Sequence, residues 1–348
     1  MRVALIGLGG VGKLHLDAYR AANGIDIVAA AEIDDARREA LLAPFGVPGF
    51  SDHRRMLKEC KPDIACVLTP ACTHEQIVLD CATAGVHVLC EKPMALTLES
   101  ARRIKAACEA AGVQFCYGAS YRYLPAVAAA RTMIDQGAIG RIQLLREELL
   151  GGQGEERWQP LPPHHYPAGG PGGSGLGLMD HGIHLIDVFR WFTGQEIIRS
   201  LGRGVFSGGP PVPEYLQMDF SAGALGLLLY NDASFPASLP TAGMFAEGAG
   251  WDCTGFVPAG GWSASPGSIE VYGTTGSLRI FHYANVLIHF SAAGARRIPL
   301  SGRASTAHFA TQIESFAAAL RLGTPPPVSA DDGIHALAAA LCAYGDDR

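Results

Sequence analysis

The sequence predicts an α/β protein of two domains, a ligand-binding domain built on a doubly wound parallel sheet and a second domain rich in strands. A glycine-rich turn lies between an apolar strand and a helix near the N-terminus. Short apolar strands then alternate with helices, and segments of alternating apolar and polar residues begin at residue 141. With 348 residues, 48% of them hydrophobic, the chain can bury two cores, and we set the domains at 1–120 and 121–348.

The glycine-rich turn follows the apolar run Val3–Ile6 and leads into a helical pattern that begins near Leu14. In a G-x-G-x-x-G turn the first glycine allows a tight turn, the second admits a pyrophosphate, and the third lets helix pack on strand. The helix N-terminus that follows favours an anion. We therefore expect a Rossmann dinucleotide site at five positions of the turn: Gly7, Gly9, Gly10, Val11 and Gly12.

Glu32 indicates which nicotinamide is bound. It ends the second apolar run, Ile27–Ala31, at the spacing from Gly12 where a carboxylate accepts hydrogen bonds from the adenosine ribose. A carboxylate at this place repels a 2′-phosphate, so NAD is favoured over NADP. Arg37 and Arg38 keep NADP as an alternative, although they suit the solvated face of a helix better.

Strands and helices continue to alternate up to Tyr117. The expected elements are helix Asp52–Cys60, strand Ile64–Leu68, helix His74–Ala84, strand Val86–Cys90, helix Leu98–Ala111 and strand Gln114–Tyr117. Ligands of such sheets bind at the carboxyl ends of the strands, where Thr69-Pro70 and Glu91-Lys92-Pro93 lie. Lys92 precedes a proline that stiffens the backbone, so its ammonium is a candidate donor to a ligand; the alternative is a loop lysine paired with Glu91.

A second polar pair stands in the later half of the chain. After a glycine-rich run, an amphipathic helix is expected from Met179 through Trp191, with Gly194 as its terminator. Asp180 and His184 stand four residues apart, which places a carboxylate and an imidazole on one face of that helix. By itself this spacing also fits a solvated face or a satisfied core pair.

Composition excludes several classes of partner. The net charge of −6 is dispersed without long runs, so we expect neither nucleic acid nor an anionic membrane surface as a partner. The nine cysteines include no C-x-x-C pair and suit buried thiols in a reducing compartment rather than disulfides or a zinc site. The apolar start, Val3–Val11, is too short to span a bilayer. We expect a cytoplasmic protein with no metal.

Several motifs together resemble the Gfo/Idh/MocA oxidoreductase family of glucose–fructose oxidoreductase and inositol dehydrogenase. The resemblance covers nearly the whole chain, and its most specific parts are Glu91-Lys92-Pro93 and the Asp180…His184 pair. The remaining parts are the glycine turn with His15, Thr69-Pro70 with His74, Gly137–Ile142, Ile269–Leu278 and the closing Phe309…Phe316 helix.

The resemblance implies a C-terminal domain with a large, mostly antiparallel sheet whose open face often meets another subunit. We therefore expect a homo-oligomer, a dimer or a tetramer, formed through this sheet. Six segments support such a sheet independently of the resemblance, because they are strand-like and several alternate between apolar and polar residues. They are Arg141–Leu150, Tyr215–Phe220, Leu225–Tyr230, Ile269–Tyr272, Leu278–Phe281 and Val286–Phe290.

The resemblance also implies an NAD(P)-dependent dehydrogenase or reductase that acts on a secondary alcohol of a sugar, an inositol or a related polyol. His184 would be the general base, Lys92 would stabilise the alkoxide, and Asp180 would hold substrate hydroxyls. His181 could exchange roles with His184, and Arg122 could meet substrate or cofactor.

The cofactor contacts implied beyond the glycine turn and Glu32 are Thr69, Pro70, His74, Glu91 and Lys92. Two long glycine-rich loops, Gln153–Gly177 and Asn231–Gly267, carry isolated aromatics, and Trp158 in the first is a candidate for stacking on a sugar ring or for docking on another subunit. Packing of these aromatics onto their own domain is at least as good an interpretation.

Three alternatives stay open. The substrate could be a non-sugar cyclic diol, such as an aromatic dihydrodiol. The chain could be a non-catalytic NAD-sensing regulator, but this role predicts loss of the lysine or the histidine, and both are retained. An NAD-dependent glycosidase is the third.

Overall fold

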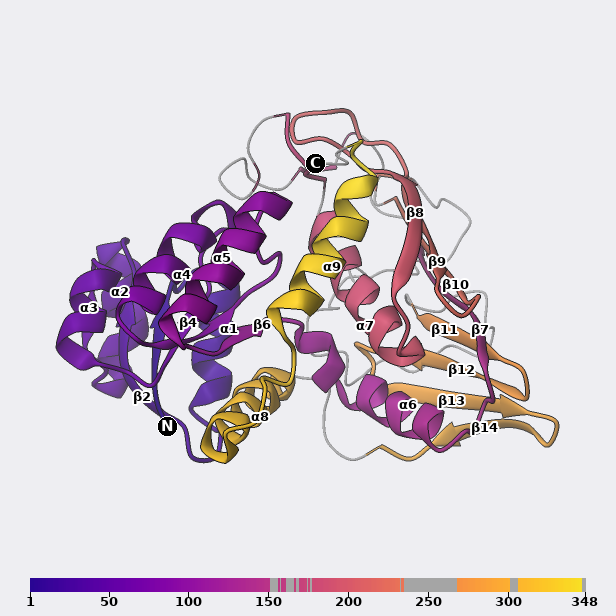
Figure 1. The fold of residues 1–348 in the computed structure, drawn as a ribbon, viewed down its shortest axis with the longest axis horizontal. Coiled ribbons are helices and arrows are strands. Elements are labelled where there is room, and N and C mark those ends of the chain that lie inside the picture. The colour runs from indigo at the N-terminus through magenta and orange to yellow at the C-terminus, as the bar shows by residue number, and fades with distance from the viewer. Residues whose placement is uncertain are drawn as a thin grey trace. The chain divides into compact units, whose positions relative to one another are not determined.

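The computed structural model describes residues 1–150, 156, 158–160, 166, 169–173, 175, 177–231, 233–234, 268–300 and 306–345. These residues fall into two compact units. The first unit comprises Met1–Ser120 with Phe309–Leu337, and the second comprises Tyr121–His308 with the residues from Ala338 onward. Each unit is described by itself, and Figure 1 labels their elements.

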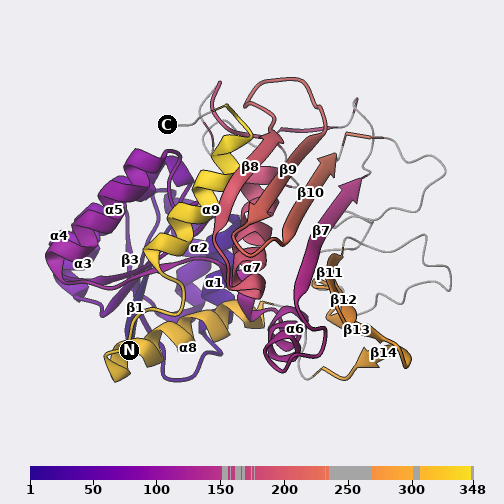
Figure 2. The same ribbon diagram turned by 45° about the vertical axis from the view of Figure 1, so that its right-hand side comes forward.

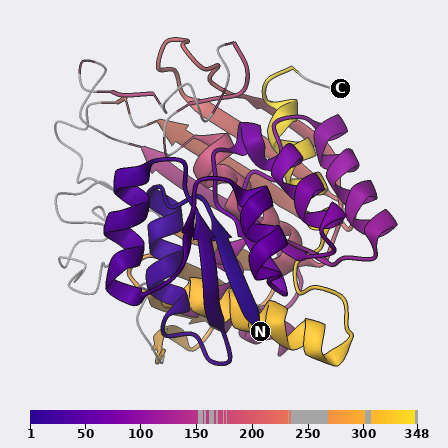
Figure 3. The ribbon, with the colours of Figure 1, turned by 90° about the vertical axis from the view of Figure 1, so that its left-hand side faces the viewer.

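The first unit contains a six-stranded parallel sheet in the order β3-β2-β1-β4-β5-β6. Its strands are Arg2–Ile6 (β1), Asp26–Ala31 (β2), Gly49–Phe50 (β3), Ile64–Val67 (β4), His87–Cys90 (β5) and Phe115–Tyr117 (β6). The helices between them are Gly10–Tyr19 (α1), Asp35–Leu42 (α2), His53–Cys60 (α3), His74–Thr83 (α4) and Leu98–Ala111 (α5), with 3₁₀ turns at Ala43–Phe45 and Ala71–Thr73. A further 3₁₀ turn, Ser120–Tyr123, follows β6 and leads into the second unit. Helices lie on both sides of the indigo strands in Figure 3, which confirms the doubly wound fold.

The strand order brings three chain segments to one edge of this sheet. β1 pairs with β2 on one side and with β4 on the other, so the order reverses beside β1. The residues that follow these strands are Gly7, Glu32 and Leu68-Thr69. In doubly wound sheets, ligands bind at this reversal, outside the carboxyl ends of the strands. The sheet thus places the predicted cofactor residues next to one another.

Helix α8, Ala307–Leu322, contributes to the first unit, whereas we expected everything beyond residue 120 in the second domain. Polar contacts hold this C-terminal part of the chain there. Glu314 accepts hydrogen bonds from Asn23, and Arg321 donates to the carbonyl of Gly24 at 2.9 Å. At the next helix, Ala330–Cys342 (α9), Asp331 pairs with Lys105 at 2.6 Å.

The second unit contains an eight-stranded sheet in the order β14-β13-β12-β11-β7-β10-β9-β8 (Figure 2). Its pairings are antiparallel except for that of β10 with β7, which is parallel, so the mostly antiparallel sheet is confirmed. The strands are Ile142–Leu150 (β7), Ile197–Arg203 (β8), Glu214–Phe220 (β9), Leu225–Asn231 (β10), Ile269–Gly273 (β11), Gly276–Phe281 (β12), Val286–Ser291 (β13) and Gly294–Ile298 (β14).

One face of this sheet is buried beneath helices. Helix α6, Pro125–Asp135, contacts β12 and β13, and the turn that precedes helix α7, Ile183–Thr193, contacts β9 and β10 (Figure 1). Side chains on the inner face, such as Leu145, Met218 and Val271, are less than 1% exposed. Among the helices described, none is both long and apolar enough to cross a bilayer.

Candidate active site

The glycine turn has the geometry that a dinucleotide requires. Gly7 has a φ of +91°, which disfavours other residues. A Cβ on Gly12 would lie 2.2 Å from the carbonyl oxygen of Gly7, so only glycine lets α1 approach β1 this closely. A Cβ on Gly9 or Gly10 would meet nothing within 4 Å. The backbone between the two crowded glycines is therefore open at the start of α1, where an anion is favoured.

Glu32 is held beside this turn. Its carboxylate accepts a hydrogen bond from the Leu8 N–H at 2.8 Å and another from the Asp34 N–H at 3.0 Å. Arg37 lies 3.4 Å from the same carboxylate, and Arg38 donates to the carbonyl oxygen of Glu32. The two arginines are therefore bound to Glu32 and its neighbours, in agreement with their interpretation as part of the α2 helix surface.

His74 joins two loops that follow neighbouring strands. One ring nitrogen lies 2.8 Å from the carbonyl oxygen of Thr69, and the other lies 3.0 Å from that of Pro93. The loop that includes Pro70 after β4 and the loop after β5 are thereby fixed to each other. Burial lowers the pKa of His74, although the two carbonyl groups oppose this shift.

Glu91 supports the loop that carries Lys92. Its carboxylate lies 3.0 Å from Nε2 of His15 and accepts the N–H of Lys92 at 3.1 Å. Burial alone would raise the pKa of Glu91, but the hydrogen bond and charge of His15 and the charge of Lys92 hold it below its usual value. Lys92 is half-buried, whereas both His15 and Glu91 are buried.

The Asp180 segment differs from the helix that we expected. Helix α7 begins at Ile183, and the residues before it, Leu178–Gly182 (η5), form a π-helical turn in which the Gly182 N–H donates to the Gly177 carbonyl. The expected helix through Trp191 and its end at Gly194 are confirmed, but its amphipathic character is wrong, because nearly all of α7 is buried. A Cβ on Gly182 would lie 3.0 Å from Tyr230, so this glycine allows the turn to approach the sheet. π-helical turns are often found at functional sites.

The two histidines of this segment have different surroundings. His184, in the first turn of α7, stacks on Tyr121 with ring centroids 3.8 Å apart and an interplanar angle of 2°. His181 lies 2.7 Å from the carboxylate of Glu147, and its other nitrogen lies 3.2 Å from the hydroxyl groups of Tyr121 and Tyr283. His181 is thus bound into a buried polar network, while Asp180 beside it is half-buried.

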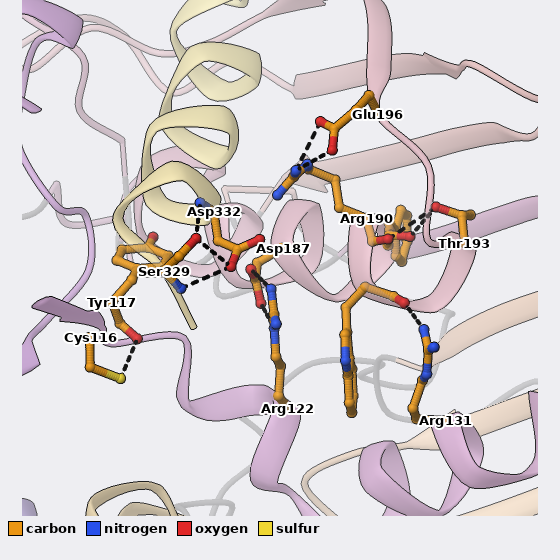
Figure 4. Close-up of polar contacts among 12 residues, drawn as sticks. Cys116, Tyr117, Arg122, Arg131, Asp187, Arg190, Thr193, Glu196, Ser329 and Asp332 are labelled. Atoms are coloured by element: carbon orange, nitrogen blue, oxygen red, sulfur yellow. Dashed lines mark hydrogen bonds and ion pairs between the residues drawn. The ribbon is translucent and has the colours of Figure 1, made fainter. Parts of the chain in front are cut away.

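Arg122 makes a two-pronged contact with Asp187 of α7 (Figure 4). The Asp187 side chain is completely buried, and that of Arg122 is 10% exposed. The guanidinium therefore holds α7 in place. The predicted contact of Arg122 with substrate or cofactor stays a prediction.

Trp158 lines a small, partly open hollow in the second unit. The other residues around it are Val205, Pro211, Val212, Glu214, Tyr230 and Asn231. Glu214 is held there by the N–H groups of Leu178 and Val205 and by the hydroxyl of Tyr344. The proposed stacking of Trp158 on a sugar stays a prediction, and most of the two glycine-rich loops lies outside the described residues.

Sequence reasoning missed the residues that surround His181. Glu147 stands at an inward-facing position of β7, between the buried Leu145 and Leu149, and a carboxylate at such a position is the one signal that could have marked it. Tyr121, Tyr283 and His282 belong to no motif. Lys92 is in the first unit, whereas Asp180, His181 and His184 are in the second.

A Rossmann unit and a unit with a large, mostly antiparallel sheet together form a two-domain dinucleotide-binding architecture. The model of an oxidoreductase family with an NAD-binding Rossmann fold matches residues 1–119, and that of the GFO/IDH/MocA C-terminal domain matches residues 127–279. The chain belongs to the Gfo/Idh/MocA oxidoreductase family.

Two curated relatives are similar to this chain in sequence, and one solved structure is similar to it in fold. The rhizopine catabolism protein MocA of Rhizobium meliloti is 30% identical over 65% of this chain and 70% of its own length. The D-glucoside 3-dehydrogenase of Escherichia coli is 29% identical over 59% of this chain, and the match spans 58% of that relative. The oxidoreductase domain protein of Kribbella flavida has the same fold, with a TM-score of 0.79, 23% identity, and coverage of 99% of this chain and 96% of that one.

Proposed function

We propose that this protein transfers a hydride between NAD and a secondary alcohol of a sugar, an inositol or a related polyol. The observation that carries the proposal is the glycine turn, with Gly12 packed against Gly7 and with Glu32 held beside it, in a chain of an oxidoreductase family. NAD is favoured over NADP because the Glu32 carboxylate would repel a 2′-phosphate. The substrate class is supported by the name of one relative, a D-glucoside 3-dehydrogenase.

The reacting alcohol needs a base for its proton and a cation for the charge that develops on its oxygen. Bound NAD supplies the hydride acceptor. We assign the base to His184, the cation to the ammonium of Lys92, and the orientation of substrate hydroxyl groups to Asp180. His184 is preferred over His181, because the ring nitrogens of His181 already contact Glu147 and two tyrosine hydroxyl groups.

A substrate screen tests the proposal. Purified protein is incubated with NAD⁺ or NADP⁺ and with sugars, glycosides, inositols and aromatic dihydrodiols, and the absorbance of the reduced nicotinamide is followed. We expect turnover with NAD⁺ and at least one sugar or polyol. Tight NADH binding without turnover of any alcohol would instead identify a nucleotide sensor, and turnover of dihydrodiols alone would identify the non-sugar alternative.

We also propose that the outer face of the eight-stranded sheet joins two copies of the chain. Strand register places apolar side chains across this face, in alternation with charged ones. They include Leu144, Leu201, Tyr215, Leu227, Leu229 and Tyr272, all half-buried or exposed. We expect light scattering to give a dimer or a tetramer, and Leu227→Glu to shift it toward monomer. A monomeric wild-type protein at micromolar concentration would contradict the proposal.

A further inference from the structure

Three side chains that could bind a metal ion converge in the interior of the second unit. Glu147 comes from β7, His181 from the π-helical turn, and His282 from the residue after β12. They are 1%, 2% and 0% exposed. One ligand atom from each lies within 4.8 Å of the others. We call these three residues the Glu147–His181–His282 cluster.

The cluster contains polar atoms that the described part of the chain leaves without hydrogen bonds of ordinary geometry. They are Oε1 of Glu147 and both ring nitrogens of His282, whose imidazole has only a weak contact with the backbone of Ile280. The nearest approach between them, from Nδ1 of His282 to Oε1 of Glu147, is 3.7 Å, which is too long for a hydrogen bond. A buried polar atom without a partner costs about 1–3 kcal/mol, so several at one point indicate a missing ligand. A cation would accept lone pairs from both the carboxylate and the imidazole.

The side chains of His181 and Glu147 also make contacts with tyrosine hydroxyl groups outside the cluster. Nδ1 of His181 lies 3.2 Å from the hydroxyl groups of Tyr121 and Tyr283, which leaves Nε2 facing the cluster. Oε2 of Glu147 accepts a hydrogen bond from Tyr230 at 3.0 Å. Metal ligands in proteins commonly have such outer hydrogen bonds, which fix the ring or carboxylate in place. Nε2 of His181 and Oε2 of Glu147 lie 2.7 Å apart and share a hydrogen-bonded proton. A bound metal ion would replace that proton.

We propose that the Glu147–His181–His282 cluster binds one divalent ion of the zinc class. Two imidazole nitrogens and one carboxylate oxygen form a ligand set that Zn²⁺ prefers, and they leave one coordination position for a water molecule or a neighbouring tyrosine hydroxyl. The ion would tie the π-helical turn to β7 and to the end of β12. Because Asp180 immediately precedes His181, the ion would also fix the position of Asp180. The metal site does not depend on the proposed hydride transfer.

The experiment measures metal content and metal spectra directly. Protein expressed with added Zn²⁺ is freed of loose metal by gel filtration and analysed by mass spectrometry of metals. We expect about one Zn²⁺ per wild-type chain and less than about 0.1 in His282→Gln. His289→Gln is the matched control, since His289 lies on β13 and contacts only the Ala138 carbonyl among the hydrogen bonds described for it. Chelated wild-type protein titrated with Co²⁺ is expected to develop visible absorption that excess Zn²⁺ abolishes.

A second measurement separates a lost ligand from a damaged fold. Circular dichroism and gel filtration establish whether His282→Gln folds, and Zn²⁺ is expected to raise the thermal midpoint of chelated wild-type protein but not that of the variant. If the variant does not fold, the wild-type metal content and Co²⁺ spectrum decide alone. Wild-type protein without metal, without a Co²⁺ spectrum and without a thermal shift would overturn the proposal, and it would assign the cluster to ordered water. His282→Gln that binds as much metal as wild type would also overturn it.

Discussion

The guanidinium of Arg122 and the carboxylate of Asp187 form a two-pronged ion pair, with N–O distances of 2.7 and 2.6 Å. It joins the turn Ser120–Tyr123 to helix α7, whose first turn carries His184. Because Asp187 is fully buried, removal of the Arg122 guanidinium takes an opposite charge and two hydrogen bonds away from a buried carboxylate. We predict that Arg122→Met lowers the free energy of unfolding by about 3–5 kcal/mol, measured by urea denaturation.

Two control variants compare the buried Arg122–Asp187 pair with an exposed ion pair. Lys13 and Asp17 form an exposed pair at 2.9 Å on α1, and Lys13→Met is expected to cost less than about 1 kcal/mol. The double variant Arg122→Met/Asp187→Leu should recover most of the loss, because no charge is then left buried. If Arg122→Met were as mild as Lys13→Met, the buried pair would not stabilise the fold.

Gly12 and Gly10 differ in the space around them. We predict that Gly12→Ala lowers the free energy of unfolding by about 1–3 kcal/mol, because its Cβ would overlap the Gly7 carbonyl. Gly10→Ala, where no atom lies within 4 Å, should leave it unchanged or slightly higher. Both are measured without nucleotide by urea denaturation, and equal effects would contradict the close packing of α1 on β1.

His74 predicts a pH dependence of stability. Since burial lowers its pKa in the folded protein, the unfolded chain binds the proton first as the pH falls. The contribution is complete above the unfolded-state pKa of about 6.5 and is lost as the pH falls toward and through the folded-state pKa. Between about pH 8 and about pH 5.5, wild type should lose more stability than His74→Gln. His335→Gln, which alters an exposed histidine, should follow wild type. Parallel curves for wild type and His74→Gln would refute the prediction.

Glu32 predicts the cofactor preference. Glu32→Ala removes the carboxylate that would bind the ribose and repel a 2′-phosphate, so the affinity for NADH should fall more than that for NADPH. Fluorescence titration with both nucleotides measures the ratio, and Glu39→Ala, an exposed change on the same helix as Arg37 and Arg38, is the control. An unaltered ratio of the two affinities would show that Glu32 does not select the cofactor.

Much of the fold follows from local sequence signals. The helix Leu98–Ala111 was predicted with the bounds that the structure has, because Thr97 caps its first turn and Gly112 ends it at a φ of +67°. The strands β8 and β14 were not predicted. β8 mixes apolar and polar residues, has no fully buried position and pairs irregularly with β9, and β14 ends the sheet with exposed arginines, so neither shows a buried alternating face.

The candidate site was predictable only where residues are close in sequence. Gly7, Gly12 and Glu32 follow from a short motif and a fixed spacing. The π-helical turn before Ile183 includes a backbone hydrogen bond from Gly182 to Gly177, five residues back, that apolar periodicity does not reveal. The Glu147–His181–His282 cluster comes from three distant segments, and only the folded sheet brings them together.

Lys92 gives the most direct test of the proposed hydride transfer. Turnover of the best alcohol found in the screen and the dissociation constant for NADH are measured for wild type, Lys92→Ala and Lys58→Ala, which alters an exposed lysine of α3. We predict that Lys92→Ala lowers kcat by at least about 10²- to 10³-fold while NADH binding stays nearly unchanged, because the ammonium stabilises charge on the alcohol oxygen. Lys58→Ala should match wild type. Turnover that survives in Lys92→Ala would contradict this account of the active site.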